Sequence, residues 1–214
     1  DGRLTSGREI LIVDREKDTR LREHIAYAKS PETAKLDQRA RAVRLAAYVD
    51  AVFSKCGRKA ADDRAETLAN QYRNRGILLG DVDPLCGGGV CRHRTLLFKA
   101  LADEAGLSVS TARGKYRHSN GRLGQHAWNE LYLDDGAVLL VDIMSPPRGW
   151  AFPRIQDPHS RKYLGQAGDD LYDKSHVVWP PYIRTLTGKS AARDRLTVEV
   201  LPPEAGAPVF YTMD

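Results

Sequence analysis

The sequence predicts an α+β protein in which helices come first and an antiparallel sheet follows. Three observations predict this: helical spacing in the first third, one strongly apolar helix in the middle, and period-two alternation after residue 107. A chain of 214 residues can bury a sizeable core as one compact domain. We expect residues 1–80 to form a helical portion packed on a core made by residues 81–214.

Two helices are expected in the first portion. The first, within SPETAKLDQRARAVRLAAYVDAVFSKCG, has Ser30 as N-cap, Pro31 in its first turn and Gly57 as its stop. Its expected buried face consists of residues three and four apart: Leu36, Ala40, Val43, Ala47 and Ala51. The second covers residues 62–76, and GILLGDVDPLCGGG (76–89) reads as a loop.

The central helix is expected over residues 91–105, with Gly106 just beyond its end. It is apolar around much of its circumference, so we expect it to be central. Strands should follow at 107–114 and in a hairpin made by HAWNELYL and AVLLVDIM around DDG. LTVEVL and PVFYT read as short late strands.

Composition narrows the possible partners. The net charge is +5, and residues 1–80 carry 17 Lys/Arg against 12 Asp/Glu. No aromatic residues alternate with the basic ones, so a solvated helical surface is favoured over nucleic-acid binding. No apolar run approaches the roughly 18–20 residues that span a bilayer, and we expect no membrane partner. Three cysteines, an odd number, favour reduced thiols in a cytosol-like compartment.

Cys91 lies where the glycine-rich loop meets the start of the central helix. Unpaired N–H groups and the helix dipole favour an anion there, which lowers the pKa of a thiol. Gly89 leaves room for a substrate backbone, so it is a candidate pocket residue. The N–H of Cys91 could donate to a developing oxyanion. Cys91 is therefore the candidate nucleophile.

A thiol nucleophile needs a base. His93 is two residues along the helix, a rotation of about 200°, and should face away from Cys91. His126, at the start of a strand, is the better candidate. Cys86, Cys91 and His93 could instead bind zinc, but no CxxC pair is present, so we expect no metal and no other cofactor.

The length of the DDG turn determines whether Asp142 lies on the same face of the hairpin as His126. If it is a three-residue loop with Gly136 in the left-handed position, Leu133 pairs with Ala137. His126 and Asp142 then become diagonal neighbours on one face of the hairpin. A two-residue loop would place Asp142 on the opposite face. The expected arrangement is Cys91 as nucleophile, His126 as base and then acid, and Asp142 as the group that orients the imidazole.

Three blocks, GVCRHRTLLFKALADEAGL, HAWNELYLDDG and LLVDIM, resemble the signature blocks of the transglutaminase-like superfamily, whose core is papain-like. The first is also similar to the N-terminal domain of plant Raf-like kinases of the ethylene-response and disease-resistance type. The resemblance covers about residues 85–145. It implies that Cys91, His126 and Asp142 form a catalytic triad. It also implies that Trp128 lines the pocket, although Trp128 could equally fill the core. An upstream side chain is implied to complete the oxyanion site, with Gln71 as candidate and Gln125 no better supported.

The implied activity is cysteine-dependent acyl transfer on protein amides. Water attacking the thioester of a Gln side chain would make the chain a deamidase, a Lys amine would make it a transglutaminase, and cleavage of a peptide bond would make it a thiol protease. The alternative is a catalytically silent protein-interaction module. The excess of Arg over Lys, 23 of 33, and the missing initiator Met fit an excised bacterial effector or toxin domain.

Overall fold

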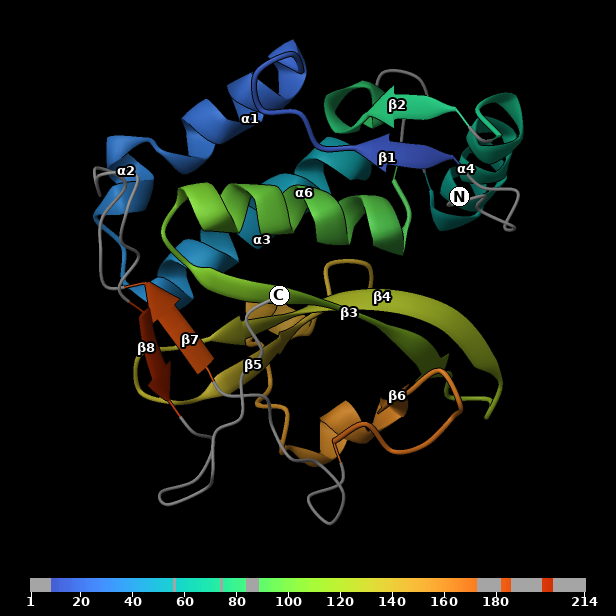
Figure 1. The fold of residues 1–214 in the computed structure, drawn as a ribbon. Helices are drawn as coiled ribbons and strands as arrows, with labels where there is room; N and C mark the ends of the chain where they lie inside the picture. Colours follow the sequence, from blue (N-terminus) through green and yellow to red (C-terminus); the bar gives the residue numbers. More distant parts are fainter. Residues whose placement is uncertain are drawn as a thin grey trace.

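The computed structural model describes residues 9–55, 57–73, 75–83 and 89–172, and the backbone of two further short strands. A four-stranded antiparallel sheet forms one layer, and helix α6 (Cys91–Glu104) packs on one of its faces. Helices α1 (Thr19–Ala28) and α3 (Gln38–Phe53) pack against α6, which therefore lies between helices and sheet (Figure 1). The fold is α+β, as predicted.

The first predicted helix is interrupted. Pro31–Ala34 forms a short helix, α2, with Ser30 as its N-cap, and α3 begins only at Gln38. The break has its own polar contacts. The Asp37 carboxylate caps α3 by accepting the N–H of Ala40 at 2.8 Å. The Arg41 guanidinium donates to the carbonyl of Ala34 at 3.0 Å and to that of Leu36 at 2.8 Å.

The predicted buried face of α3 is also wrong. Ala51 is exposed, and the residues that α3 buries are Ala42, Leu45, Ala46, Val49 and Phe53. The expected stripe contained three alanines, whereas the observed face contains larger side chains. Burying Leu45, Val49 and Phe53 removes more apolar surface from water, so this face turns to the core.

Helix α4 begins earlier than expected, at Arg58, and ends at Gln71 (Arg58–Gln71). The segment predicted as a loop then forms a strand, β2 (Gly76–Leu78), followed by a 3-10 turn, η1 (Leu79–Asp81). Strand β2 pairs in parallel with β1 (Ile10–Ile12). Three-residue strands are too short for alternation to be visible in a sequence, which explains why this pair was not predicted.

Helix α6 agrees with the prediction at both ends. It begins at Cys91 and ends at Glu104, and Gly106 beyond it has a φ of 74°, a left-handed conformation suited to glycine. Its buried side chains are His93, Arg94, Thr95, Leu97, Phe98, Ala100, Leu101 and Ala102. The helix is central, as its apolar composition predicted.

The sheet has the order β5-β4-β3-β6 and consists of β3 (Ser108–Arg117), β4 (Leu123–Tyr132), β5 (Val138–Val141) and β6 (Tyr163–Leu164). The DDG turn is the predicted one: the N–H of Leu133 donates to the carbonyl of Ala137 at 2.9 Å, and Gly136 has a φ of 80°. Strand β5 ends at Val141, opposite Asn129. From Trp128 back to Leu123, β4 therefore has no β5 residue beside it, and this edge is open.

Two hydrophobic clusters occupy the two faces of the sheet. The larger one combines Leu21, Leu45 and Leu68 with Phe98 and Leu131, so described residues before and after residue 80 share one core. The smaller one consists of Trp128, Leu140, Ile155, Tyr163 and Tyr172. Because neighbouring strand residues such as Leu139 and Leu140 fall in different clusters, the clusters lie on opposite faces.

The remaining described elements are short. They are the 3-10 turns η2 (Arg148–Trp150) and η3 (Pro158–Lys162), and the antiparallel pair β7 (Tyr182–Thr185) and β8 (Val198–Leu201). Strand β8 falls within the predicted strand LTVEVL, whereas PVFYT lies outside the described residues. None of the helices in the described part of the chain has both the length and the apolar character that crossing a bilayer requires.

Candidate functional site

Cys91 is the first residue of α6, and its free thiol is half-buried. It faces the open edge of β4. Two groups of β4 act on the thiol there: hydrogen bonding by the His126 side chain and by the backbone N–H of Ala127 lowers the pKa of Cys91. The N–H of Ala127 can reach the sulfur because β5 has already ended, so no neighbouring strand accepts it on that side.

His126 is held from the opposite side by Asp142. The imidazole Nε2 lies 2.7 Å from Oδ2 of Asp142, which follows directly after β5. The same oxygen accepts the hydroxyl of Tyr163 at 2.9 Å. Oδ1 accepts the backbone N–H groups of Met144 at 2.9 Å and Ser145 at 3.1 Å. With both oxygens bonded, the carboxylate is fixed in position.

These contacts change the pKa of all three groups. Burial alone would raise the pKa of Cys91, but the hydrogen bond and charge of His126 outweigh it and lower that pKa. Burial would lower the pKa of His126, yet hydrogen bonds to Asp142 and Cys91 raise it to about 9. Burial would raise the pKa of Asp142, but its bond to His126 keeps that pKa below the usual value. The arrangement therefore favours a thiolate beside an imidazolium.

Two cavities meet at this sulfur. The larger, of about 730 Å³, lies between α4, β1, the start of α6 and the edge of β4. The smaller, of about 360 Å³, is bounded on its far side by Tyr116, His118, Met144 and Ser145. Both are lined by Asp62, Val90, Cys91, Gln125 and His126. Cys91 and His126 thus lie at the junction of a groove that continues to both sides.

Trp128 lines neither cavity and fills the core, the second of the two roles expected for it. It is fully buried behind His126, with the two rings 6.1 Å apart and nearly parallel. Its indole N–H donates to the hydroxyl of Tyr172 at 2.7 Å, and that hydroxyl donates to Glu130 at 2.7 Å. Trp128 shares the face of His126 because both are even-numbered residues of β4, but it does not reach either cavity.

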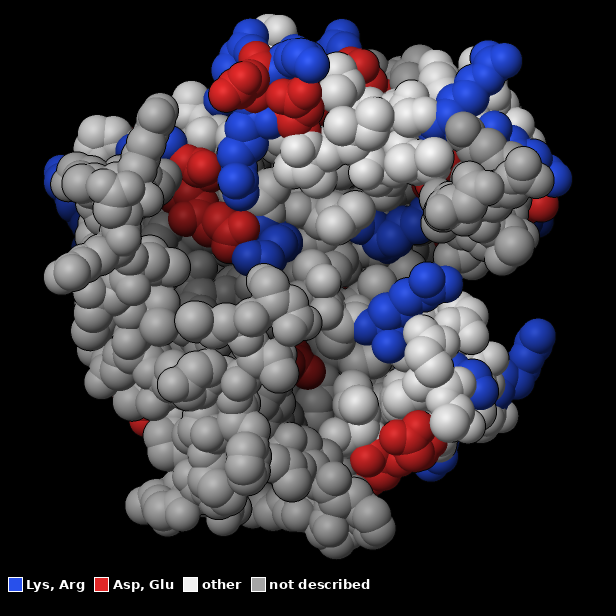
Figure 2. Space-filling model, in the orientation of Figure 1, with Lys and Arg blue, Asp and Glu red and all other residues white. Residues whose placement is uncertain are grey.

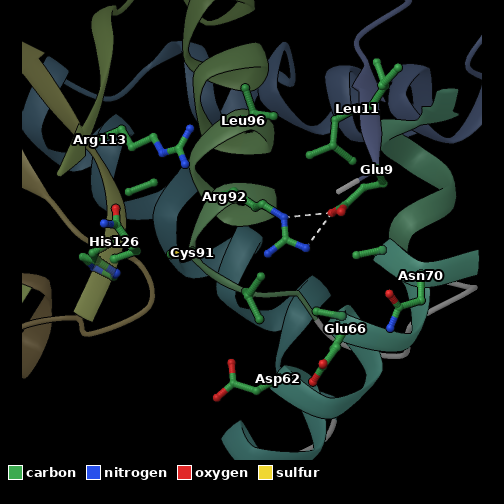
Figure 3. A pocket seen from close by; sticks show the side chains of 16 residues that line it. Glu9, Leu11, Asp62, Glu66, Asn70, Cys91, Arg92, Leu96, Arg113 and His126 are labelled. Carbon is green, nitrogen blue, oxygen red and sulfur yellow. Dashed lines mark hydrogen bonds and ion pairs between the residues drawn. The ribbon is translucent and has the colours of Figure 1, made fainter. Parts of the chain in front are cut away.

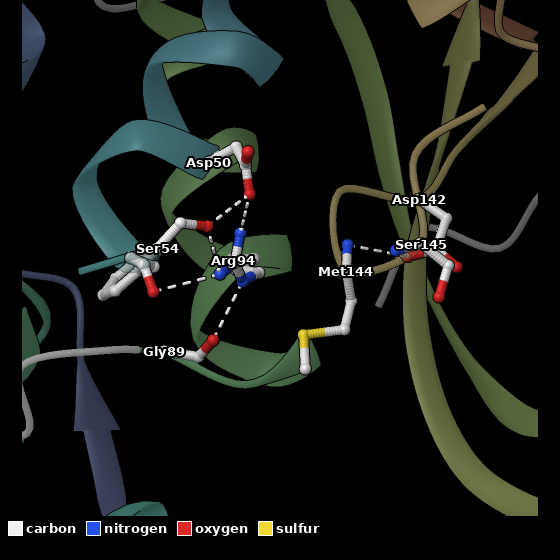
Figure 4. A network of polar contacts seen from close by, with 8 residues as sticks. Asp50, Ser54, Gly89, Arg94, Asp142, Met144 and Ser145 are labelled. Atoms are coloured by element: carbon white, nitrogen blue, oxygen red, sulfur yellow. Dashed lines mark hydrogen bonds and ion pairs between the residues drawn. The ribbon is translucent and has the colours of Figure 1, made fainter. Parts of the chain in front are cut away.

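Gly89 is also placed differently from the prediction. It is buried against α3, where an added Cβ would lie 2.4 Å from the Phe53 ring. Its carbonyl accepts the Arg94 guanidinium at 2.8 Å, and Arg94 also binds Asp50 and the carbonyl of Phe53 (Figure 4). The glycine permits close packing of the loop on α3, which fixes the start of α6. It does not make room for substrate.

Gln71 ends α4 with an exposed side chain and lines neither cavity, so the structure does not bring it to Cys91. The side-chain amides on the groove are those of Asn70, on the larger cavity, and Gln125, on both. Asn70 is one residue before Gln71, and a rotation of about 100° separates neighbouring residues of a helix. The sequence located this region of α4 but not the side chain that faces the groove.

His93 faces away from Cys91, as predicted. It is fully buried, its Nε2 lies 2.9 Å from Oε1 of Glu9, and its Nδ1 accepts the N–H of Val90 at 3.3 Å. Because both ring nitrogens are occupied, His93 has none left for a metal ion. Among the described residues, no group of three His, Cys, Asp or Glu side chains could hold one. Cys86 and Cys56 lie outside the described residues.

Two residues of the site have no signal in the sequence. Tyr163, which bonds Asp142, follows directly after the short turn η3, whose position periodicity does not predict. Glu9, the residue before β1, reaches the start of α6 across more than 80 residues of sequence. Each contact depends on long-range packing of a single polar side chain, and no local pattern marks such a residue.

The described domain thus places a cysteine at the start of a buried helix, beside a histidine that an aspartate holds. The family described as EDR1/CTR1/ARMC3, peptidase-like, matches residues 2–149, and the chain belongs to this family. Human Armadillo repeat-containing protein 3 is 33% identical over 106 residues, which are 49% of this chain and 11% of that protein. The chain thus corresponds to a small part of this relative.

Proposed function

We propose that the chain is a cysteine-dependent acyltransferase or hydrolase that acts on protein amides through Cys91, His126 and Asp142, in a papain-like arrangement of the transglutaminase type. The observation that carries the proposal is that Cys91 and His126 line the same two cavities, while the His126 imidazole is held 2.7 Å from the Asp142 carboxylate. Membership in a peptidase-like family supports it.

In the proposed reaction the Cys91 thiolate attacks the amide carbonyl carbon, and the electron pair of the C=O bond moves to its oxygen. The N–H of Cys91, at the start of α6, has no acceptor among the described residues and is the proposed donor to this oxyanion. The His126 imidazolium gives its proton to the leaving nitrogen as the C–N bond breaks, and a thioester remains. Water or an amine then attacks the thioester, and His126 takes the proton of that nucleophile.

Asp142 is assigned the orienting role. Nε2 of His126 donates to a carboxylate that Tyr163 and two backbone N–H groups already hold, so the other ring nitrogen is directed toward the sulfur. An ionised Asp142 also stabilises the imidazolium that the reaction needs. This division of labour requires Asp142 to stay charged, which agrees with its lowered pKa.

The partner in this proposal is a protein, because the groove continues to both sides of Cys91 and can hold a chain that runs past the sulfur. Deamidation, transglutamination and proteolysis share the thioester and differ in what resolves it. We further propose that the domain acts in a reducing compartment, where the Cys91 thiol stays free. No feature of the described residues supports an effector or toxin role.

Alkylation by iodoacetamide followed by mass mapping tests the activated thiol. Cys91 should react well below pH 8 and ahead of Cys56 and Cys86, because the thiolate is the reactive species. Intact-mass analysis of candidate proteins incubated with the chain then identifies the reaction: a gain of about one mass unit marks deamidation, crosslinking marks transglutamination, and cleavage marks proteolysis. Cys91→Ala is the matched inactive control.

The competing proposal is a catalytically silent interaction module. One observation favours it: the side-chain amides on the groove, Asn70 and Gln125, are exposed, so neither is held as a rigid second oxyanion donor. Such a module predicts slow, similar alkylation of all three cysteines, and binding that Cys91→Ala leaves unchanged. Rapid labelling of Cys91 at pH 6–7, at about a hundred times the rate of an ordinary thiol, would exclude it.

A further inference from the structure

We propose that the larger cavity beside Cys91 recognises a cationic side chain, Lys or Arg, of the polypeptide substrate, through Asp62 and Glu66 of α4. This inference rests on the proposed function and adds the class of substrate to it. Three independent features carry it: the placement of the two carboxylates, the charges that remain after pairing, and a buried carboxylate oxygen without a donor.

The two carboxylates lie on one face of α4. Asp62, Glu66 and Asn70 are four residues apart, a spacing that aligns side chains along a helix, and all three line the larger cavity (Figure 3). Asp62 also lines the smaller cavity, so it lies at the junction where Cys91 and His126 are found. A substrate side chain that extends from the reacting amide toward α4 would therefore meet Asp62 first and Glu66 next.

Charge pairing leaves these two carboxylates available. Of the other charged groups on the cavity, Arg92 is paired with Glu9, whose Oε1 lies 2.6 Å from one guanidinium nitrogen and 2.8 Å from Nε. The interactions with His93 and Arg92 outweigh the burial of Glu9 and lower its pKa to about 2, so it stays ionised. Asp62 and Glu66, in contrast, form no ion pair with any described residue.

The opposite wall carries the opposite charge. Arg113 of β3 lines the cavity across from α4, on the side of His126 (Figure 3). The space-filling view shows the surface hollowed between the region of α4 and the end of β3 and β4, with Lys and Arg side chains on the sheet side (Figure 2). A cationic side chain in the groove would be attracted to the α4 wall and repelled from the sheet wall, which defines the direction in which it points.

Glu9 gives the third indication of a cationic ligand, and it is independent of α4. Its side chain is fully buried and lines the same cavity, and one oxygen holds Arg92 and His93. The other oxygen, Oε2, accepts no hydrogen bond in the described part of the chain. A buried carboxylate oxygen without a donor is unfavourable. An ammonium or guanidinium entering the cavity brings several N–H donors, whereas an acidic side chain would bring none.

A peptide in extended conformation fits these features. Side chains alternate between the two sides of an extended chain, so a residue adjacent to the reacting one points to a wall and not along the groove. If that residue is Lys or Arg, its long stem can cover Ala65 and Ala69, which line the cavity between the polar residues of α4. The inferred substrate therefore carries a basic residue next to the amide that Cys91 attacks.

The test measures binding in the absence of chemistry. Fluorescein-labelled peptides with a central Gln, flanked by Lys, by Ala or by Glu, are titrated with the Cys91→Ala variant of the full chain, and binding is followed by fluorescence polarisation. We expect the Lys-flanked peptide to bind about tenfold more tightly than the Glu-flanked one, since each exposed ion pair contributes a small factor. The preference should shrink as salt rises from about 0.05 to 0.5 M.

Asp62→Asn combined with Glu66→Gln should reduce this tenfold preference to about twofold or less. Asp63→Asn is the matched control, because Asp63 is an exposed carboxylate of the same helix that lines neither cavity. It should keep the preference, and circular dichroism checks that each variant is folded. Equal binding of the three peptides, tighter binding of the Glu-flanked peptide, or a preference that survives in the double variant would overturn the inference.

Failure of this inference and failure of the proposed function give different results. The binding assay uses a chain without the Cys91 thiol, so it does not depend on a reactive thiolate. A parent chain whose Cys91 is inert toward iodoacetamide but whose Cys91→Ala variant prefers Lys-flanked peptides would refute the enzyme and leave the cationic subsite. A reactive Cys91 together with equal binding of the Lys-flanked and Glu-flanked peptides would leave the enzyme and refute the cationic subsite.

Discussion

His93, in the first turn of α6, and His126, in β4, are both buried, and each is bonded through Nε2 to a carboxylate: 2.9 Å to Glu9 for His93, and 2.7 Å to Asp142 for His126. Their pKa values nevertheless move in opposite directions. Burial lowers the pKa of His93, whereas hydrogen bonds to Asp142 and Cys91 outweigh burial and raise that of His126 to about 9.

The difference arises at the second ring nitrogen and in the neighbouring charges. In His93 the nitrogen Nδ1 accepts the N–H of Val90, so it must keep its lone pair, and the ring stays neutral. The flanking charges of Arg92 and Arg94 also oppose a proton there. In His126 the second nitrogen meets the Cys91 thiol, an acid that can give up its proton. A histidine–carboxylate pair is thus structural or reactive according to what its other nitrogen contacts.

Replacing each histidine by alanine tests this contrast with the largest expected effect. His126→Ala removes the partner that favours the thiolate, so alkylation of Cys91 by iodoacetamide at pH 6 should slow by about a hundredfold. His93→Ala should change that rate by less than about threefold at a temperature where the variant is folded. If His93→Ala slowed alkylation as much as His126→Ala, both histidines would have to act on the thiol, and the contrast would fail.

Unfolding by urea should give the complementary result. His93→Ala leaves a cavity in the core and deprives the buried Glu9 of one of its two partners, so we expect a loss of about 3 kcal/mol in the free energy of unfolding. His159→Ala, at an exposed histidine of η3, is the control and should change it by less than about 0.5 kcal/mol. A His93→Ala variant as stable as the control would mean that the Glu9 contact contributes nothing in solution.

Asp142→Asn should separate the orienting role from simple packing. The N–H groups of Met144 and Ser145 hold one oxygen of Asp142, so the amide NH₂ of Asn would face His126 and Tyr163. An NH₂ group cannot accept from Nε2, so the charged imidazolium loses its stabilising partner. The pKa of His126, about 9 in the parent, should fall by about 1–2 units.

This shift can be measured from the C2 proton of His126 by NMR, and from the alkaline limb of the rate profile. Loss of the imidazolium proton removes the general acid, so the rate should fall as pH rises through the pKa of the coupled pair. In Asp142→Asn the fall should begin at lower pH. An alkaline limb that stayed in place would show that Asp142 does not stabilise the charged form of His126.

The sequence predicted the meeting of Cys91, His126 and Asp142 because each step depends on a local rule. A helix start places the cysteine, strand alternation places the histidine, and the turn at Gly136 sets which residue faces it. The observed pairing of Leu133 with Ala137 agrees with that reasoning. Such rules involve a few neighbouring residues, and they hold wherever tertiary packing does not compete with them.

The assignments of Trp128, Gly89 and Gln71 to the site did not depend on local rules of this kind. Trp128 and Gly89 were assigned to the pocket, but their places depend on where the groove opens and on how closely the loop approaches Phe53. Gln71 was assigned to the oxyanion site, but the rotation of α4 turns Asn70 and not Gln71 to the groove. Each depends on the relative position of two elements that are distant in sequence, and no local pattern encodes that position.

The smallest expected effect concerns Gly136, in the turn between β4 and β5. Gly136→Ala forces a side chain into a left-handed backbone, φ 80°, although its Cβ would meet no atom within 4 Å. The cost is therefore one of backbone conformation, about 1 kcal/mol in urea unfolding. Gly121→Ala, at φ 77° in the turn between β3 and β4 and equally open, is the control for this cost.

The two variants should lose similar stability and differ only at the site. A distortion at Gly136 displaces β5 against β4, and with it Asp142 against His126, so alkylation of Cys91 at pH 6 should slow by about twofold to threefold. Gly121 lies in the turn between β3 and β4, away from β5 and Asp142, so Gly121→Ala should leave that rate unchanged. Equal rates in both variants, with the expected loss of stability, would show that Asp142 keeps its position through Met144, Ser145 and Tyr163 and not through the turn.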